Sequence, residues 1–226
     1  MSEIRARAGD AGPRVAEGLR EAIRRGDYAP GTRILQAEVA ERFGASRVPV
    51  REALRILENE GLVRLVANTG AWVSSLTLAE CEEIYRMRER LEPLLLSYAA
   101  PLLDSRALDE LDELAREMSR TDDVDVFLAL DRRFHLGSYR AARTLQLGDL
   151  VAKLWDSTQP YRRAYTLSIG EDARRIAHEE HHLLIAALRD GDVEEAERVL
   201  AGHIRRTRRR LSRHPELFES LSRDGR

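Results

Sequence analysis

The chain has 226 residues, of which 43% are hydrophobic and 34% charged, and its formal net charge is −2. These values are typical of a soluble globular protein with one or two domains, and they exclude nucleic-acid binding through the bulk charge of the chain. The single cysteine excludes an internal disulfide and a zinc site of several thiolates, and no uncharged apolar run is long enough for a membrane span, so we expect a cytoplasmic protein.

The first third of the sequence combines three helical patterns with a hairpin. Residues 1–12 are small and charged and are typical of a flexible N-terminus. Apolar residues at helical spacing, followed by glycines, predict helices over 13–26, 36–43 and 46–60. The β-prone runs "LVRLV" and "AWVSS", joined by "ANTG", predict a hairpin. This order is that of a winged helix-turn-helix, which we expect to span residues 13–76.

From residue 77 onward only helical patterns occur. We expect helices near 77–100, 104–120, 123–140, 144–168, 172–190 and 192–212. They predict an all-α helical bundle over 77–213, followed by a C-terminal tail over 214–226, so that the fold class is mainly α. The arginine run "RRTRRRLSRH" near the end is interpreted as a solvated helix end whose cations complement the helix dipole.

The stretch "SRVPVREALRILENEG", residues 46–61, places charge at the front of the third helix. Ser46 suits the N-cap, and Pro49 falls in the first turn, where its missing N–H costs little. Arg47 and Arg51 share one face. Such a pair is often a solvated surface, but cations on the first turns of a helix are unfavourable without an anionic partner. The position favours a recognition helix whose arginines contact DNA.

The stretch "HEEHH", residues 178–182, matches the His-Glu-x-x-His motif of zinc proteases. Both histidines and the glutamate of that motif must line one site. On a helical wheel, His182 and Glu179 fall on the polar side and His178 at the margin, whereas His181 lies among apolar residues. We therefore expect no enzyme, and a metallohydrolase remains only as an alternative.

Three of the predicted helices carry aspartate or histidine side chains, which are common metal ligands, on the apolar faces that would point into a shared interior. Asp131 and His135, four residues apart, lie on one apolar face, and His181 and His203 lie on the apolar faces of two later helices. Any one of them alone fits a hydrogen-bonded core side chain better than a metal ligand. Three imidazoles and one carboxylate together suit a divalent cation such as Zn²⁺ or Ni²⁺, because an unpaired buried aspartate is costly.

Residues 15–75 resemble the DNA-binding module of the GntR family of bacterial transcription regulators. The stretch "GTRILQAEVAERFGASRVPVREALRILENEGLVRLVANTGAWVS" carries the resemblance. It implies that Arg47 and Arg51 contact operator bases and phosphate, and that Gly70 at the wing tip approaches the minor groove. Val48 departs from the family pattern, in which threonine is commoner at this position. The expected DNA-binding residues are Ser46, Arg47, Val48, Pro49, Arg51 and Gly70.

The helical region resembles the FadR-type C-terminal domain (FCD) of the same family. "DRRFH" at 131–135, the stretch 180–192 and "HI" at 203–204 carry this resemblance. It implies a divalent metal ion that helps to hold a small carboxylate effector. The implied metal ligands are Asp131, His135, His181 and His203. The resemblance also implies that Arg88 faces the effector cavity, and we expect Tyr161 and Arg162 to line it as further effector-binding residues.

The two resemblances together predict a homodimeric regulator, acting as a repressor on double-stranded DNA. It would bind a pseudo-palindromic operator of the TnGTnnnACnA kind and leave it, or change its position on it, when a small organic acid binds. One alternative keeps the DNA role but makes the metal purely structural.

Overall fold

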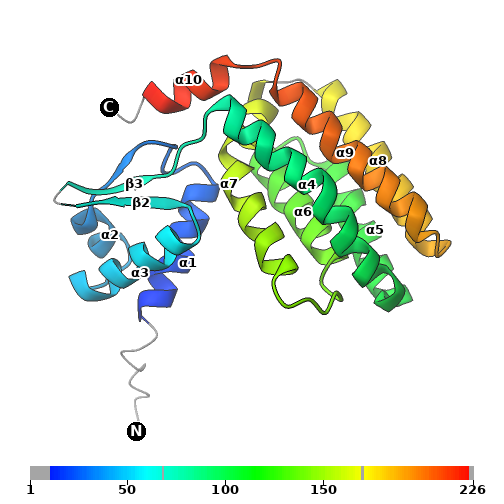
Figure 1. Ribbon diagram of the computed structural model, residues 1–226, viewed down its shortest axis with the longest axis horizontal. Helices are drawn as coiled ribbons and strands as arrows, with labels where there is room; N and C mark the ends of the chain where they lie inside the picture. Colours follow the sequence, from blue (N-terminus) through cyan, green and yellow to red (C-terminus); the bar gives the residue numbers. More distant parts are fainter. Residues whose placement is uncertain (1–10, 68, 169–170, 224–226) are drawn as a thin grey trace, which may run out of the picture. The chain divides into compact units, whose positions relative to one another are not determined.

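The chain forms two compact units (Figure 1). The computed structural model describes residues 11–67, 69–168 and 171–223. Among these, one unit runs up to Leu76 and also takes in the segment from Phe218 onward, and the other covers 77–217. The predicted flexible N-terminus, 1–12, lies almost wholly outside the described residues.

The first unit is a winged helix-turn-helix. Its elements are α1 (Ala11–Arg24), β1 (Arg33–Ile34), α2 (Gln36–Arg42), α3 (Arg47–Asn59), β2 (Val63–Val66) and β3 (Gly70–Val73). Strand β3 lies between β1 and β2 and is antiparallel to both. Alternation along the sequence does not predict β1, because two residues are too few to show it. The predicted hairpin is present as β2 and β3.

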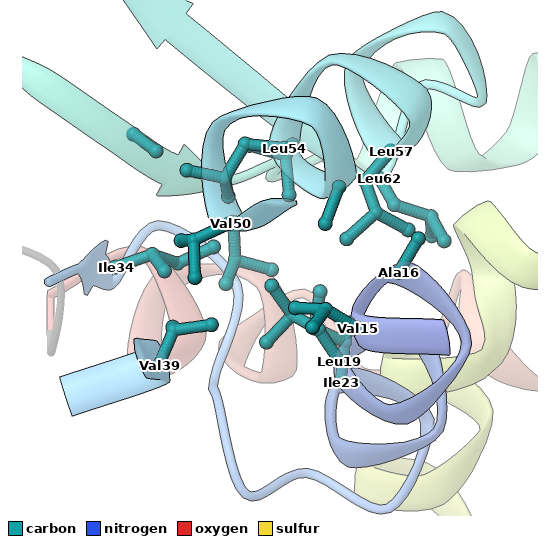
Figure 2. Packing of buried hydrophobic residues seen from close by; sticks show 14 residues of the cluster. Val15, Ala16, Leu19, Ile23, Ile34, Val39, Val50, Leu54, Leu57 and Leu62 are labelled. Carbon is teal, nitrogen blue, oxygen red and sulfur yellow. The ribbon is translucent and has the colours of Figure 1, made fainter. Parts of the chain in front are cut away.

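One apolar core holds this unit together (Figure 2). Helices α1 and α3 face each other across it, and the sheet adds further apolar side chains. The buried side chains of α1 and α3 include Val15, Leu19, Ile23, Val50, Leu54 and Leu57. Each contributes about 1.5–3 kcal/mol through burial. Since these positions fix which face of α3 is inside, Arg47 and Arg51 are left exposed on the outside.

The second unit is a bundle of helices. Its elements are α4 (Leu78–Ala99), the 3-10 helix η2 (Ala100–Leu102), α5 (Ser105–Arg120), α6 (Val124–Ser138), α7 (Leu147–Ser168), α8 (Glu171–Arg189) and α9 (Val193–Leu211). Four of them begin at a side-chain cap. Thr77 forms a capping box with Glu80, and Asp104, Asp123 and Asp192 each accept from backbone N–H groups of the helix they start.

Packing in the second unit brings distant segments together. Helix α4 packs against α7 and α9, α8 packs against α5 and α9, and α6 packs against α5 and α7. Leu96, Met118, Phe134 and Trp155 are each at most 1% exposed. The predicted mainly α fold, with a winged helix-turn-helix before a helical bundle, is confirmed.

A further helix, α10 (Glu216–Arg223), lies in the segment that the sequence predicts to be a tail. Eight residues are too few to show helical periodicity clearly, although Pro215 directly before it suits a helix start. Phe218 is buried, at 5% exposure, which gives the helix an apolar anchor. Across the described ranges, no helix is both long and apolar enough to cross a membrane.

Candidate DNA-binding surface and metal centre

The front of α3 and the tip of the wing frame one hollow in the first unit. It has a volume of about 540 Å³, and its lining includes Arg47, Val48 and Arg51 from α3 together with Thr69 and Gly70 from the hairpin. The structure therefore brings four of the six predicted DNA-binding residues to one surface.

The two remaining predicted residues shape the start of α3. Ser46 occupies the N-cap position with extended backbone, but its side chain makes no capping hydrogen bond. Pro49 is half-buried in the first turn, where no helical hydrogen bond is lost. Beside it, Val48 is 75% exposed, an unusual position for an apolar side chain. The first N–H groups of α3 and its dipole are thus left for an anion.

Three arginine side chains line this hollow and give it positive charge. Arg47, Arg51 and Arg55 follow one another at four-residue spacing and all line it, and none of its described lining residues is acidic. Within the described part of the chain, these three guanidinium groups form no ion pair. Arg55 is not among the predicted residues, although the four-residue spacing that joins Arg47 to Arg51 also extends to it.

The wing is positively charged and tightly built. Arg33 and Arg64 stack over Trp72, with guanidinium carbon to ring-centroid distances of 5.7 and 5.8 Å. Arg33 also donates a 2.7 Å hydrogen bond to the carbonyl of Thr69. Gly70 has φ of 124°, a region that favours glycine, and an added Cβ would lie 3.4 Å from Nε of Arg33.

Four predicted metal ligands meet in the interior of the second unit. Asp131 and His135 come from α6, His181 from α8 and His203 from α9, and one donor atom from each lies within 4.8 Å of the others. The first three side chains are 1% exposed and that of His203 is 11% exposed. Four separate predictions therefore converge on one buried cluster.

The donor spacing fits a shared ion. Nε2 of His135 lies 3.3 Å from Nε2 of His181, and Oδ1 of Asp131 lies 3.7 and 3.5 Å from these two atoms. Neighbouring donors around an ion with bonds of about 2.1 Å are roughly 3.0–3.4 Å apart. The ring of His203 lies 5.0 and 5.1 Å, centroid to centroid, from the other two imidazoles. An Asp/His₃ cluster of this size is compatible with a divalent metal ion.

Burial sets the protonation of the cluster. It lowers the pKa of His181 to about 3 and that of His203 to about 4, and it lowers the pKa of His135 well below its usual value. Burial raises the pKa of Asp131, but the charge of Arg162 and the adjoining imidazoles outweigh it and hold that pKa below its usual value. At neutral pH the cluster is one carboxylate with three neutral imidazoles, the protonation state that metal ions require.

One of the imidazoles, that of His203, contacts a carboxylate on the side away from the cluster. Nδ1 of His203 lies 2.9 Å from Oε2 of Glu180, which also pairs with Arg206. This contact leaves Nε2 of His203 for the cluster and raises the basicity of the ring. Nδ1 of His135 and of His181 have no hydrogen-bond partner among the described residues. Glu180 was not predicted, although it directly precedes His181 in "HEEHH".

One of the two predicted effector residues of α7, Arg162, borders the cluster. Arg162 donates a 2.6 Å hydrogen bond to Oδ2 of Asp131, and its guanidinium carbon lies 4.8 Å from the ring centroid of Trp155. Tyr161, directly before it, is buried at 1% exposure. One buried nitrogen of Arg162, Nη1, has no hydrogen-bond partner among the described residues. Tyr85 Oη and Gln159 Oε1 are also buried without a hydrogen-bond partner among the described residues.

Arg88 is neutralised inside the bundle. Its Nε donates to Oε1 of Glu92 at 2.6 Å, its Nη1 donates to Oγ1 of Thr158 at 3.0 Å, and its guanidinium carbon lies 4.2 Å from the ring centroid of Trp155. The other oxygen of Glu92 accepts from Trp155 Nε1 and from the Tyr139 hydroxyl. Arg88 is thus buried, and its guanidinium group is already paired with Glu92, a carboxylate of the chain itself.

The metalloprotease motif is not assembled. His182 is 48% exposed, Glu179 is 62% exposed and pairs with Arg175, and His178 packs edge-on against Phe127. None of these three belongs to the cluster that His181 joins.

Two family models cover most of the chain. Residues 12–73 match the model described as bacterial regulatory proteins, gntR family, and residues 83–206 match the FCD domain. The chain belongs to the GntR family. Within it, this GntR protein is a DNA-binding transcriptional regulator and not an enzyme, and the expected resemblance is confirmed.

Three relatives illustrate the similarity. YdhC of Bacillus subtilis, described as an HTH-type transcriptional regulator, is 34% identical over 52% of this chain and 54% of that protein. The gluconate operon transcriptional repressor of Bacillus subtilis is 31% identical over 80% of this chain and 76% of that protein. The solved structure of Escherichia coli McbR/YncC has a TM-score of 0.83 at 26% identity, and the match covers 90% of this GntR protein and 98% of that chain.

Proposed function

We propose that this GntR protein is a homodimeric repressor. A small carboxylate effector would release it from its operator or change its orientation on the operator. The observation that carries the proposal is the buried Asp/His₃ cluster beside Arg162, whose Nη1 has no hydrogen-bond partner within the described ranges. A buried cation next to a metal-type donor set is suited to a carboxylate. The domain limits that we propose are 13–76 for DNA binding and 77–213 for metal and effector.

The DNA contacts follow from the hollow at the front of α3. Arg47 and Arg51 would form bidentate bonds to guanine or phosphate in the major groove, with Ser46, Val48 and Pro49 beside them. Gly70 would bring the wing backbone close to the minor groove. Two such surfaces, one from each protomer, would match the half-sites of a pseudo-palindrome, and the protein would act where the chromosome lies, in the cytoplasm.

An exposed apolar stripe on α4 supports the homodimer. Met87, Leu94 and Tyr98 are 39%, 45% and 54% exposed, and Leu91 between them is half-buried. Their spacing of four, three and four residues places them on one seam, as in paired helices. A stripe of this kind costs free energy in water and is covered when a second copy packs against it.

The metal ion would be Zn²⁺ or Ni²⁺, held by Asp131, His135, His181 and His203. When bound, it supplies open coordination positions to which a carboxylate oxygen can bind. Arg162 would pair with the same carboxylate, with Tyr161 beside it. Arg88, which is paired with Glu92 and lies against the ring of Trp155, is the third proposed effector residue. Tyr85 Oη and Gln159 Oε1 are both buried without a hydrogen-bond partner in the described part of the chain, which supports a polar ligand in this interior. Gluconate, after which the related operon repressor of Bacillus subtilis is named, is itself a carboxylate.

Repression and release would be two populations of the dimer. An effector can shift them only by binding one better than the other. The alternative, a structural metal that never touches the effector, keeps the DNA role and the same four ligands.

Calorimetry distinguishes the two versions. Small carboxylates, gluconate among them, are titrated into metal-loaded and metal-stripped protein after direct metal analysis. We expect the affinity for the carboxylate to fall at least tenfold when the metal is removed. We also expect a saturating concentration of the carboxylate to abolish the salt-sensitive binding of the operator. Equal affinity for both forms would contradict effector coordination by the metal.

A further inference from the structure

The last turns of α9 concentrate positive charge that neither site above uses. The segment from Arg198 to His214 holds seven arginines and no acidic residue, although the formal net charge of the whole chain is −2. Arg198 pairs with glutamates of its own helix, and Arg208 pairs with Glu89. The other five arginines turn to one hollow of about 280 Å³, which Gly202 also lines: Arg205, Arg206, Arg209, Arg210 and Arg213.

This charge is only partly compensated inside the protein. Arg206 pairs with Glu180. Arg205, Arg209 and Arg213 form no ion pair with any residue that the structure describes. The helix dipole favours cations at this end, by about 0.3–1 kcal/mol each, but that effect stabilises single charges and gives no reason for five guanidinium groups to share one hollow. Their mutual repulsion is relieved when an anion with several charges binds among them.

We infer that this hollow binds a small anion with at least two phosphate groups, at a site separate from the metal and effector. A guanidinium group matches phosphate oxygens through two parallel N–H bonds, so several of them favour phosphate over a single carboxylate. A hollow of about 280 Å³ admits pyrophosphate or the phosphate chain of a nucleotide. The space beside Gly202 is open, because an added Cβ would meet nothing within 4 Å.

The charge test uses paired variants of the full-length, metal-loaded protein. Inorganic pyrophosphate is titrated by calorimetry into wild type and into the double variant Arg205→Ala/Arg209→Ala, whose two side chains are exposed. We expect at least a tenfold loss of affinity. Arg106→Ala/Arg120→Ala removes the same charge from α5, where the side chains are 87% and 69% exposed, and should change affinity less than twofold.

The steric test leaves charge unchanged. Gly202→Leu fills the hollow and raises helix propensity, so we expect it to abolish pyrophosphate binding at an unchanged or higher melting temperature. Because residue 202 adjoins a predicted metal ligand, bound metal is measured in parallel and should equal that of wild type. Orthophosphate should bind at least tenfold more weakly than pyrophosphate. ADP should compete with pyrophosphate if nucleotides are the source, and failure to compete assigns the site to free pyrophosphate.

Four results would overturn the inference. They are no binding of pyrophosphate by wild type, equal losses in the two double variants, full affinity in Gly202→Leu with its metal retained, and equal affinity for orthophosphate. Loss of duplex DNA binding in Arg205→Ala/Arg209→Ala without any pyrophosphate binding would instead assign the surface to nucleic acid. None of these results depends on the effector, so the proposed function is tested separately.

Discussion

Arg162 and Asp131 share a 2.6 Å hydrogen bond through Oδ2, while Oδ1 of the same carboxylate faces His135 and His181 at 3.7 and 3.5 Å. One carboxylate thus divides its oxygens between a permanent cation and the histidine cluster. This arrangement keeps Asp131 ionised in the interior before any metal binds. It also makes Arg162 a structural partner of the cluster as well as a candidate effector contact.

Replacing Arg162 with methionine should destabilise the metal-free protein. The variant leaves a buried carboxylate among neutral imidazoles, which costs about 3–5 kcal/mol. Zinc should recover part of this loss, because the ion replaces the missing positive charge. Urea unfolding with chelator and with zinc measures both effects. Arg163→Met is the matched control, since its pair with Asp125 is 28% and 49% exposed and contributes about 0–1 kcal/mol. Equal losses in the two variants would contradict the role of Arg162.

Replacing Arg47 with alanine should weaken operator binding by about 1–3 kcal/mol, or roughly 5- to 150-fold, without lowering the melting temperature. The side chain is exposed and unpaired within the described part, so its removal costs the fold little. Arg25→Ala is the control, because Arg25 is 53% exposed in the same unit but does not line the hollow. Fluorescence anisotropy with an operator duplex and a scrambled duplex gives the comparison. If the two variants bind equally well, Arg47 does not contact bases.

The neighbours His181 and His182 provide a matched pair for the metal site. His181→Ala removes a donor from the buried cluster, and we expect at least a hundredfold loss of zinc affinity. His182→Ala changes a side chain that is 48% exposed and should leave affinity within twofold. Competition with a chromophoric chelator measures both. Similar affinities in the two variants would disprove the cluster as the metal site.

Cys81 offers a pH-dependent probe of the second unit. Burial raises the pKa of its thiol to about 12, and the side chain is 1% exposed. At pH 8 its thiolate fraction is then about a thousandfold below that of an ordinary cysteine. The unfolded chain ionises first as pH rises past 9, so this group lowers folding stability at alkaline pH. Labelling with a thiol reagent should be slow in buffer and fast in urea. Equal rates would show that the start of α4 opens freely.

Local geometry explains what could be predicted from the sequence. The face shared by Arg47 and Arg51, and the inward positions of Asp131 and His181, depend only on the helical repeat and on neighbouring apolar residues. The pairing of Arg88 with Glu92 is also local, but its placement over Trp155 requires the packing of α4 against α7. That packing is a long-range property that no periodicity reveals.

The features that were not predicted from the sequence also depend on long-range packing. Tyr85 Oη and Gln159 Oε1 are buried with no hydrogen-bond partner among the residues that the structure describes, and such a condition depends on every neighbour in the folded bundle. Helix α10 was missed because its single buried aromatic, Phe218, gives no repeat. The sequence predicts which faces are inside and does not predict which buried polar atoms lack a partner.

Two tyrosine hydroxyls test whether the interior is built for a ligand. Tyr139 donates a 2.8 Å hydrogen bond to Glu92, so Tyr139→Phe should destabilise the protein by about 1.5–3 kcal/mol. Tyr85 Oη has no partner among the described residues, so Tyr85→Phe should leave the stability of the ligand-free protein unchanged or slightly raised. The same Tyr85→Phe variant should bind the carboxylate effector at least fivefold more weakly. Urea unfolding and calorimetry on both variants measure these effects. If Tyr85→Phe destabilises the ligand-free protein as much as Tyr139→Phe, the Tyr85 hydroxyl already has a structural partner and is not reserved for a ligand.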